Sequence, residues 1–504
     1  MWTTGVCIAI AITAFLVAYI RLAFRTRRNN EPPYVAGHFL WGSGVEFSQN
    51  VVLFLHKSQK QLGDIFTFRV LNKYITIIMD PHCYEDFNKE RNFDFAPMVA
   101  KVNRNIFGFT VKDSFGLITY ASKTVKGKHL RSSMKIFTRN LQDSLEELMK
   151  TNDTHASNCN VEADGNTIDW SRESLRTMMS KTLFTAIFYT AFGHSADPSG
   201  EEKVKDFHPQ VFDKNFQNFH KVFNYLWIGL PRRLFPKAAE SYNIMCQLLN
   251  HHELLQRNEV SDFVKFSIEY MLQVGEKDED IMGHTLVYLH VQYNTVRLAY
   301  WCVYKMVEQP RVLMDLEMEL SKAIEEKRED GEETVAFTLN EINKLPLLDS
   351  FLKETLRMYG GAVMIRYCTD DTEFKMPNGQ KYAVRKGNMV AMYPPTTHMD
   401  PEIFKDPEAF KHDRFVNATF YKYGKELKNP LAPFGSLCVA RQMAPLQVKW
   451  FLVNLINSFS LELPEGEKTE PKTECYGHEI LPPVNDVQVH FRVKEGAPVL
   501  AYSD

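Results

Sequence analysis

Residues 433–444 read PFGSLCVARQMA, in which a glycine-containing turn leads to a single cysteine. The apolar segment 446–455 follows and predicts a helix. A thiolate at a helix N-terminus is stabilised by the helix dipole, and Arg441 adds a positive charge close to Cys438. Such a thiolate is a soft ligand suited to haem iron. Taken alone, Cys438 is more simply explained as an ordinary buried thiol, so this stretch needs support from the rest of the chain.

A charged pair lies upstream, in residues 347–357 (LLDSFLKETLR). The spacing of Glu354 and Arg357 places both side chains on one face of a helix. An exposed pair would add almost nothing to stability, but the surrounding apolar residues suggest that this pair is buried. A buried pair needs further partners to offset its desolvation, and Arg414 in residues 410–415 (FKHDRF) is a candidate third member.

The segment 278–306 predicts a long helix that is apolar on most sides, which is typical of the middle of a large core. Its polar interruptions either form hydrogen bonds inside the core or face a buried cofactor. They include His284, His290, Gln292, Asn294 and Thr295. Two alternating runs, 65–70 and 74–79, predict a strand hairpin, and the polar stretches 152–167 and 325–334 predict linkers.

The composition sets broad limits on the class of protein. The chain has 504 residues, of which 44% are hydrophobic, so it can bury a sizeable core. Its net charge of -3 gives no reason to expect a nucleic-acid partner. The eight cysteines show neither CxxC pairs nor zinc-site spacing, so we expect reduced thiols in the cytosol.

The N-terminus predicts a membrane anchor. Residues 2–20 carry no charge, and a helix of that length spans about 30 Å, the thickness of a bilayer core. The arginines that follow, among them Arg21 and Arg25, place the rest of the chain on the cytosolic side. We therefore expect an anchor at residues 1–24 and a basic, proline-containing linker at 25–35. A cleaved signal peptide is disfavoured, because no basic region precedes the apolar run.

The order of these parts resembles the cytochrome P-450 superfamily over the whole chain. The resemblance implies a mainly α fold with a small β subdomain, in which residues 36–504 form the catalytic domain behind one N-terminal transmembrane helix. It implies haem b, with the Cys438 thiolate as the axial iron ligand. It also implies a structural role for Glu354, Arg357 and Arg414, which stabilise the part of the core on the cysteine side of the haem. The further residues that it implies for cofactor binding are Arg366, Arg441 and Phe434.

A finer resemblance points to the clan of sterol 7α-hydroxylases, sterol 12α-hydroxylase and prostacyclin synthase. The matching stretches are 31–33, 63–67, 79–82, 106–109, 229–231, 348–350, 399–403, 410–415 and 480–487. In this clan the central helix has asparagine where most members have the oxygen-activating threonine. Asn294 fits that position, and Thr295 follows it, so the resemblance implies a catalytic role for both residues.

Two features depart from the family pattern. The loop before Cys438, which normally screens the sulfur with backbone N–H groups, is about three residues short. Ala440 also stands where the family usually has glycine. His290 and Tyr293 replace smaller residues beside the oxygen site. Either change would retune the enzyme or abolish its activity.

The resemblance implies a monooxygenase that hydroxylates a sterol or a similar hydrophobic lipid with O2. No GxGxxG or Walker motif is present, so we expect the electrons to come from an NADPH-dependent flavoprotein reductase. The expected setting is the endoplasmic reticulum membrane, with a single span, the bilayer as a partner and the catalytic domain in the cytosol. The alternatives are an endoperoxide isomerase like prostacyclin synthase, a monooxygenase of terpenoid or other secondary metabolism, and an inactive lipid-binding relic.

Overall fold

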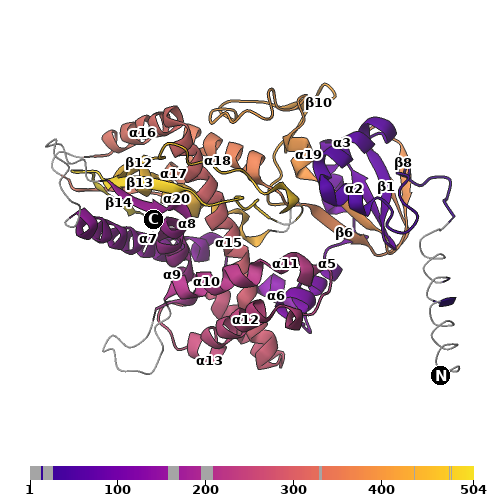
Figure 1. Cartoon of the computed structure of the whole chain (residues 1–504), viewed down its shortest axis with the longest axis horizontal. Helices are drawn as coiled ribbons and strands as arrows, with labels where there is room; N and C mark the ends of the chain where they lie inside the picture. Colours follow the sequence, from indigo (N-terminus) through magenta and orange to yellow (C-terminus); the bar gives the residue numbers. More distant parts are fainter. Residues whose placement is uncertain are drawn as a thin grey trace.

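The long apolar segment forms a single helix, α15 (Asp278–Glu308), as predicted. Three acidic residues in its first turn complement the positive end of the helix dipole. The helix ends just before Pro310, the first residue of the next helix, α16 (Pro310–Glu325). Buried side chains point from α15 in all directions, because the helix runs through the middle of the other helices (Figure 1).

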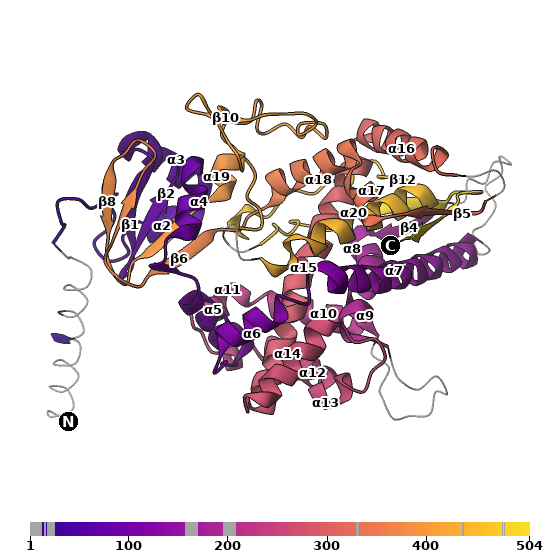
Figure 2. The same cartoon turned by 180° about the vertical axis from the view of Figure 1, so that it is seen from behind.

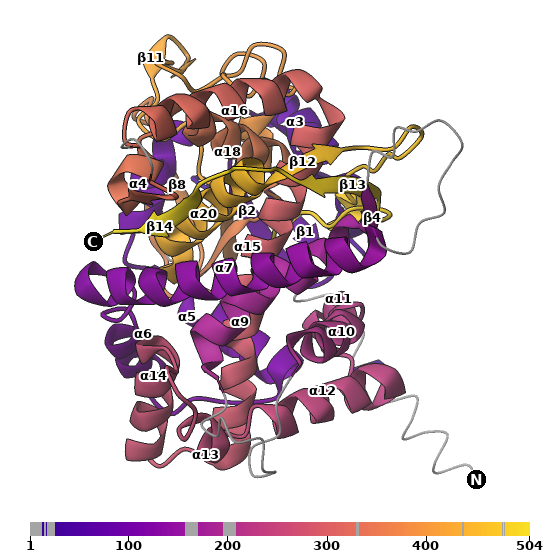
Figure 3. The ribbon, with the colours of Figure 1, turned by 90° about the vertical axis from the view of Figure 1, so that its left-hand side faces the viewer.

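Helices from distant parts of the chain surround α15, and the side view shows α7 lying across it (Figure 3). The helices that pack against α15 include α8 (Leu175–Met179), α14 (Asp262–Gln273), α18 (Pro346–Tyr359) and α20 (Met443–Ser458), and α7 (Gly127–Ala156) packs on α20. Their apolar residues form one large hydrophobic cluster, at whose centre Trp301 stacks on Tyr359 with ring centroids 4.0 Å apart. This core holds the helices that position the candidate site.

A five-stranded sheet lies at one end of the molecule, next to the small sheet that contains β8 (Lys381–Val384) (Figure 2). Its strand order is β1 (Ile65–Val70), β2 (Lys73–Ile78), β9 (Met389–Met392), β6 (Met364–Cys368) and β3 (Phe93–Asp94). The predicted hairpin is confirmed, since β1 and β2 pair antiparallel with Val70 opposite Lys73. Alternate side chains go to opposite faces: Phe66 and Phe68 pack towards α3 (Val51–Leu62), whereas Ile65 packs towards Phe87.

The remaining strands form small sheets. They are β4 (Ser171–Ser174), β12 (Phe459–Glu462) and β13 (Gln488–Val493) in one sheet, β5 (Thr334–Phe337) with β14 (Val499–Tyr502), β7 (Thr372–Lys375) with β8 (Lys381–Val384), and β10 (Tyr421–Lys422) with β11 (Lys425–Glu426). The expectation of a mainly α fold with a small β part is therefore confirmed.

The other helices are short or lie on the outside of the core. They are α2 (Gly44–Gln49), α4 (Tyr84–Lys89), α5 (Ala96–Val102), α6 (Ser114–Ala121), α9 (Thr185–Phe192), α10 (Pro209–His220), α11 (Phe223–Trp227), α12 (Pro236–Leu248), α13 (His251–Leu254), α17 (Leu339–Asn343) and α19 (Pro394–His398). A π-helical turn, η2 (Asn103–Phe107), follows α5, and a 3-10 turn, η5 (Val439–Arg441), precedes α20.

The computed structural model describes residues 13–14, 17, 26–156, 170–194, 208–328, 332–435, 438–475, 477 and 479–503. Within these ranges, none of the helices is both long and apolar enough to cross a membrane. Almost all of the predicted anchor, residues 1–24, lies outside the described residues, as does most of the predicted linker 152–167. The linker predicted at 325–334 lies between α16 and β5. The six described cysteines are free thiols, as expected.

Candidate functional site

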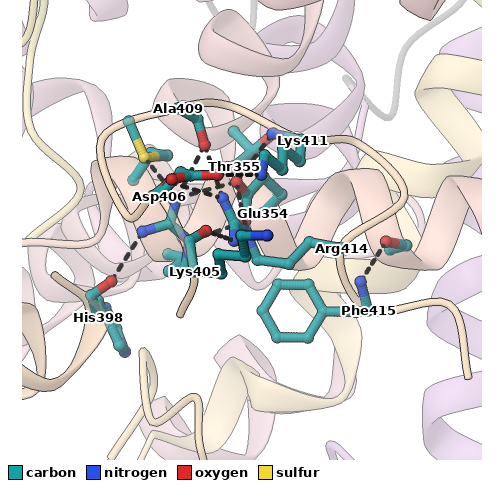
Figure 4. A network of polar contacts seen from close by, with 12 residues as sticks. Glu354, Thr355, His398, Lys405, Asp406, Ala409, Lys411, Arg414 and Phe415 are labelled. Atoms are coloured by element: carbon teal, nitrogen blue, oxygen red, sulfur yellow. Dashed lines mark hydrogen bonds and ion pairs between the residues drawn. The ribbon is translucent and has the colours of Figure 1, made fainter. Parts of the chain in front are cut away.

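A buried cluster of three charged residues anchors the region around α18, as Figure 4 shows. Glu354 and Arg357 occupy one face of α18, and their side chains are 0% exposed. Arg357 donates from Nε and Nη2 to the two carboxylate oxygens of Glu354, at 2.7 and 2.9 Å. Arg414 Nε donates to the same two oxygens, each at 3.0 Å. The structure thus brings together the three residues that the sequence nominated.

Backbone carbonyl groups satisfy the rest of this cluster. Arg357 Nη1 donates to the carbonyl oxygen of His398 at 2.7 Å, which ties α18 to α19. Arg414 donates to the carbonyl oxygens of Lys405 and Ala409 at 2.6 and 2.7 Å. These bonds offset the desolvation of the buried charges, as a stable buried cluster requires. They also fix the segment that leads towards the cysteine loop.

Cys438 lies at the start of the 3-10 turn η5, in an extended backbone conformation. The helix predicted at 446–455 is confirmed as α20, which begins at Met443, and η5 lies between this helix and Cys438. The backbone N–H groups of Ala440 and Arg441 donate to the sulfur. Burial raises the pKa of the Cys438 thiol, whereas these two N–H groups and the charge of Arg441 favour the thiolate.

The cysteine loop packs against strand β6. Gly435 has φ of 54°, a left-handed conformation that favours glycine, and a methyl group added there would lie 3.4 Å from Met364. Phe434 packs on the main hydrophobic cluster. Met364 and Arg366 lie on the same strand, β6. The contact with Met364 therefore places the cysteine loop next to the strand that carries Arg366, one of the predicted cofactor-binding residues.

Arg366 on β6 is buried, whereas Arg441 at the end of η5 is exposed. Arg366 is only 6% exposed, and its guanidinium group lies over the rings of Phe87 and Phe95, at 5.4 and 4.9 Å. Burial raises the pKa of the half-buried Tyr84, and the positive charges of Arg441 and Arg366 oppose that rise. A guanidinium group provides the charge that an anionic group of a cofactor needs.

An apolar cavity of about 270 Å³ begins directly after Cys438. Val439, Ala440 and Met443 line one side, and the face of α15 that holds Val287 and Val291 lines another. Its further lining residues include Leu117, Ile118, Val125, His284, Tyr288 and Gln447. The hydroxyl group of Tyr288 bonds to Nε2 of His284 at 2.7 Å. Burial lowers the pKa of His284 to about 4, so this cavity is uncharged at neutral pH.

Asn294 lies next to the C-terminal segment of the chain. Its side-chain oxygen accepts a hydrogen bond from the backbone N–H of Ile480 at 3.2 Å. Thr295, the other predicted catalytic residue, is 2% exposed within the core. The structure therefore does not bring these two side chains to one surface, because consecutive positions on a helix point about 100° apart.

A second polar cluster lies beside Asn294 and was not expected as a unit. Arg297 forms an ion pair with Oε1 of Glu479, and His220 Nε2 lies 2.9 Å from the same oxygen. The His290 ring stacks on that of His220 with centroids 5.8 Å apart. These two histidines and Glu479 place ligand atoms within 4.8 Å of one another, but Arg297 already neutralises the carboxylate. In the sequence, the signal for this cluster was Arg297, a charged residue within the apolar helix α15.

These observations fit a haem group. The Cys438 sulfur is bonded by backbone N–H groups, an apolar cavity begins at the next residue, and Arg366 lies buried on the strand that contacts the cysteine loop. A thiolate sulfur, an apolar surrounding and cationic groups for the propionates are the contacts that haem requires.

The comparisons with known proteins extend over nearly the whole chain. A model of the cytochrome P450 family matches residues 32–489. Cytochrome P450 7A1 of Rattus norvegicus is 27% identical over 518 residues, which cover 98% of this chain and 100% of the relative. Cholesterol 7-alpha-monooxygenase of Cricetulus griseus is 27% identical with the same coverage, 98% and 100%. The 7-alpha-hydroxycholest-4-en-3-one 12-alpha-hydroxylase of Homo sapiens is 27% identical and covers 96% of this chain and 97% of the relative.

Proposed function

The chain belongs to the cytochrome P450 family, and on this premise we propose that it is a haem-thiolate monooxygenase that hydroxylates a sterol. The observation that supports the substrate class is the full-length similarity to relatives named as sterol 7α- and 12α-hydroxylases. The apolar cavity beside Cys438 agrees with a rigid hydrocarbon substrate, because it offers few polar partners.

We assign the cofactor contacts to four residues. Cys438 would supply the axial thiolate, which the N–H groups of Ala440 and Arg441 screen. Arg366 and Arg441 would pair with the propionates, and Phe434 would pack beside the sulfur. When bound, the haem iron supplies the activation of dioxygen and the transfer of one oxygen atom into a C–H bond.

The protein's own contribution is orientation and exclusion of water. The apolar face of α15, including Val287 and Val291, would hold the hydrocarbon body of the substrate by burial of its surface. We propose Asn294 as the polar residue of the oxygen site. Its side chain is oriented by the N–H of Ile480, so its amide group remains able to donate a hydrogen bond.

The electrons and the location are part of the same proposal. An NADPH-dependent flavoprotein reductase would supply the electrons, because the sequence has no nucleotide-binding motif of its own. Residues 1–24 would anchor the chain in the endoplasmic reticulum membrane, with residues 36–504 as the catalytic domain in the cytosol. The apolar N-terminal run and the arginines that follow it support this topology.

The test uses the purified full-length chain in phospholipid nanodiscs with the reductase and NADPH. Each of a panel of sterols is supplied under O2, and the products are identified by mass spectrometry. We expect a sterol product with one added hydroxyl group, formed only when NADPH and the reductase are both present. A terpenoid panel is run in parallel, and turnover of terpenoids alone would replace the sterol as substrate.

Two further measurements separate the remaining alternatives. The reduced, carbon-monoxide-bound protein should show the red-shifted Soret band of a thiolate ligand, and its absence would indicate a relic without this ligation. Conversion of an endoperoxide without reductase would indicate an isomerase, because such a substrate brings its own O–O bond. Either result would contradict the proposed hydroxylase.

A further inference from the structure

One face of α15 is bonded to residues 479–481, near the C-terminal end of the chain. Oδ1 of Asn294 accepts a hydrogen bond from the backbone N–H of Ile480 at 3.2 Å. Two helical turns further on, Nε1 of Trp301 donates to the carbonyl oxygen of Leu481 at 2.7 Å. The spacing i and i+7 places both side chains in one row along the helix, so this row binds successive residues of one segment.

An ion pair in the same row binds the residue that precedes these two. Arg297, three positions after Asn294, pairs with Oε1 of Glu479. The side chains of Arg297 and Glu479 are 12% and 7% exposed, so the pair is buried. Arg297 therefore holds the residue whose peptide bond to Ile480 carries the N–H that Asn294 accepts.

The carbonyl end of this peptide bond is held as well. The carbonyl oxygen of Glu479 accepts from the backbone N–H of Gly361 at 3.0 Å. A methyl group added to Gly361 would lie 2.8 Å from that oxygen, so glycine permits this close approach. The backbone N–H of Leu481 donates to the carbonyl oxygen of Tyr359 at 2.9 Å. The segment thus lies between α15 and the C-terminal end of α18, and its peptide groups have a defined orientation.

His220 of α10 is the third member of the cluster around the carboxylate. Nη2 of Arg297 lies 3.3 Å from Nδ1 of His220, and arginine only donates, so Nδ1 is the acceptor. In the neutral ring the proton is then on Nε2, which lies 2.9 Å from Oε1 of Glu479. The Glu479 side chain is therefore held from α10 and from α15.

The N–H of Ile480 sets the orientation of the Asn294 amide. A carboxamide has an acceptor end and a donor end, and a rotation of 180° exchanges them. The N–H pairs only with the oxygen, so the NH2 end points away from residues 479–481. One hydrogen bond of ordinary strength favours this orientation about fivefold, which corresponds to about five in six molecules. Without that bond, either end of the amide faces the proposed oxygen site.

We infer that Arg297 and Glu479 are positioning residues for Asn294. Their ion pair holds the Ile480 N–H against the Asn294 oxygen and so fixes which end of the amide faces the oxygen site. The inference rests on the proposed function, in which Asn294 is the polar residue of that site. The two residues act through Asn294 and not by contact with the reacting atoms.

The test removes both charges together, because a lone buried charge would itself destabilise the protein. The double variant Arg297→Met/Glu479→Leu leaves the hydrogen bonds of Leu481 in place, so the segment stays bound. The holoenzyme is assayed with reductase, NADPH and a sterol that it hydroxylates. The favoured amide orientation should fall from about five in six molecules to about one in two. We therefore expect the hydroxylated product per NADPH consumed to fall about twofold, with the KM for the sterol unchanged.

An infrared measurement that needs no turnover follows the amide directly. A hydrogen-bond donor beside carbon monoxide bound to the iron lowers the C–O stretching frequency. We expect one main C–O band in the wild type and two bands of about equal area in the double variant. The second band should lie near the frequency of Asn294→Ala, which has no donor at this position.

Arg297→Lys is the second variant and decides if the double variant does not fold. It keeps the positive charge but loses the fork that reaches Glu479 and His220 together, so the second C–O band should again gain area. The matched control is Lys494→Met/Glu317→Leu, which removes a 2.7 Å ion pair between α16 and the residue after β13. It should change neither the product per NADPH nor the C–O bands.

The background of Asn294→Ala separates positioning from a general structural effect. There the double variant should cause no further loss of product per NADPH, because the residue through which the ion pair acts is absent. An equal further loss in that background would overturn the inference, as would a single C–O band at the wild-type frequency in the folded double variant. Failure of every sterol to react would instead contradict the proposed function, while the C–O bands would still test the positioning role.

Discussion

Arg414 Nε lies 3.0 Å from both carboxylate oxygens of Glu354. This contact joins α18 to the segment that precedes the cysteine loop, because the same guanidinium group also donates to the carbonyl oxygens of Lys405 and Ala409. The buried carboxylate thus has two cationic partners, and removal of either leaves charge uncompensated in the core.

Replacement of Arg414 by glutamine should destabilise the folded protein by about 3–5 kcal/mol, because one partner of a buried charged cluster is lost. Urea unfolding of the purified protein measures the change in stability. The amount of haem that the variant retains shows whether the haem site stays intact. Arg311→Gln is the control, since its side chain is 78% exposed and forms a surface ion pair with Asp315. It should change stability by less than about 0.5 kcal/mol. Equal effects of the two replacements would contradict a structural role for Arg414.

Replacement of Cys438 by serine should abolish the red-shifted Soret band of the reduced, carbon-monoxide-bound protein, because serine offers no thiolate. Hydroxylase activity should fall below detection in the same preparation. Cys246→Ser is the control, since this free cysteine on α12 does not line the apolar cavity. Persistence of the band in Cys438→Ser would assign the ligand to another residue.

Acidification should destabilise the protein through His398. Burial and the charge of Arg357 lower its pKa to about 3, whereas an unfolded histidine titrates near 6.5. The unfolded state therefore binds a proton that the folded state excludes. The contribution to stability is fully present above about pH 6.5 and is lost as the pH falls towards 3, at about 1.4 kcal/mol per pH unit.

The variant His398→Phe tests this pH dependence, because it keeps the ring volume and removes the titrating group. Urea unfolding between pH 4 and 7 should show a smaller slope than in the wild type. Some slope remains, since burial also lowers the pKa of His284, to about 4. His252→Gln is the control, because His252 is 65% exposed. If the slope of the unfolding free energy against pH is unchanged in His398→Phe, then His398 is not the residue that takes up a proton on unfolding.

Replacement of Asn294 by alanine should lower the amount of hydroxylated product per NADPH consumed, because the proposed oxygen site loses its polar group. The loss of the bond from Ile480 N–H should cost about 1 kcal/mol of stability, which urea unfolding measures. Thr285→Val is the control, since Thr285 is buried on α15, bonds to the carbonyl oxygen of Ile281 and does not line the apolar cavity. If wild type and Asn294→Ala form equal amounts of hydroxylated product per NADPH consumed, Asn294 does not act at the oxygen site.

The sequence was informative wherever a pattern is local. The apolar run of α15, the alternation of β1 and β2, and the spacing of Glu354 and Arg357 each follow from the periodicity of one element. The helix predicted at 446–455 lies within α20, but the 3-10 turn between Cys438 and this helix was not predicted. The sequence suggested a helix dipole at the sulfur, whereas the structure provides the N–H groups of a 3-10 turn.

The sequence by itself determined the family and the fold class and led to the prediction of Cys438 as the ligand, because these depend on the order and spacing of residues along the chain. Only the tertiary structure decided which distant side chains meet. Arg297 and Glu479 lie on separate segments, and no local pattern pairs them. Such contacts form when packing of the core brings segments together, and the cost of burying a charge then selects the arrangement that pairs it.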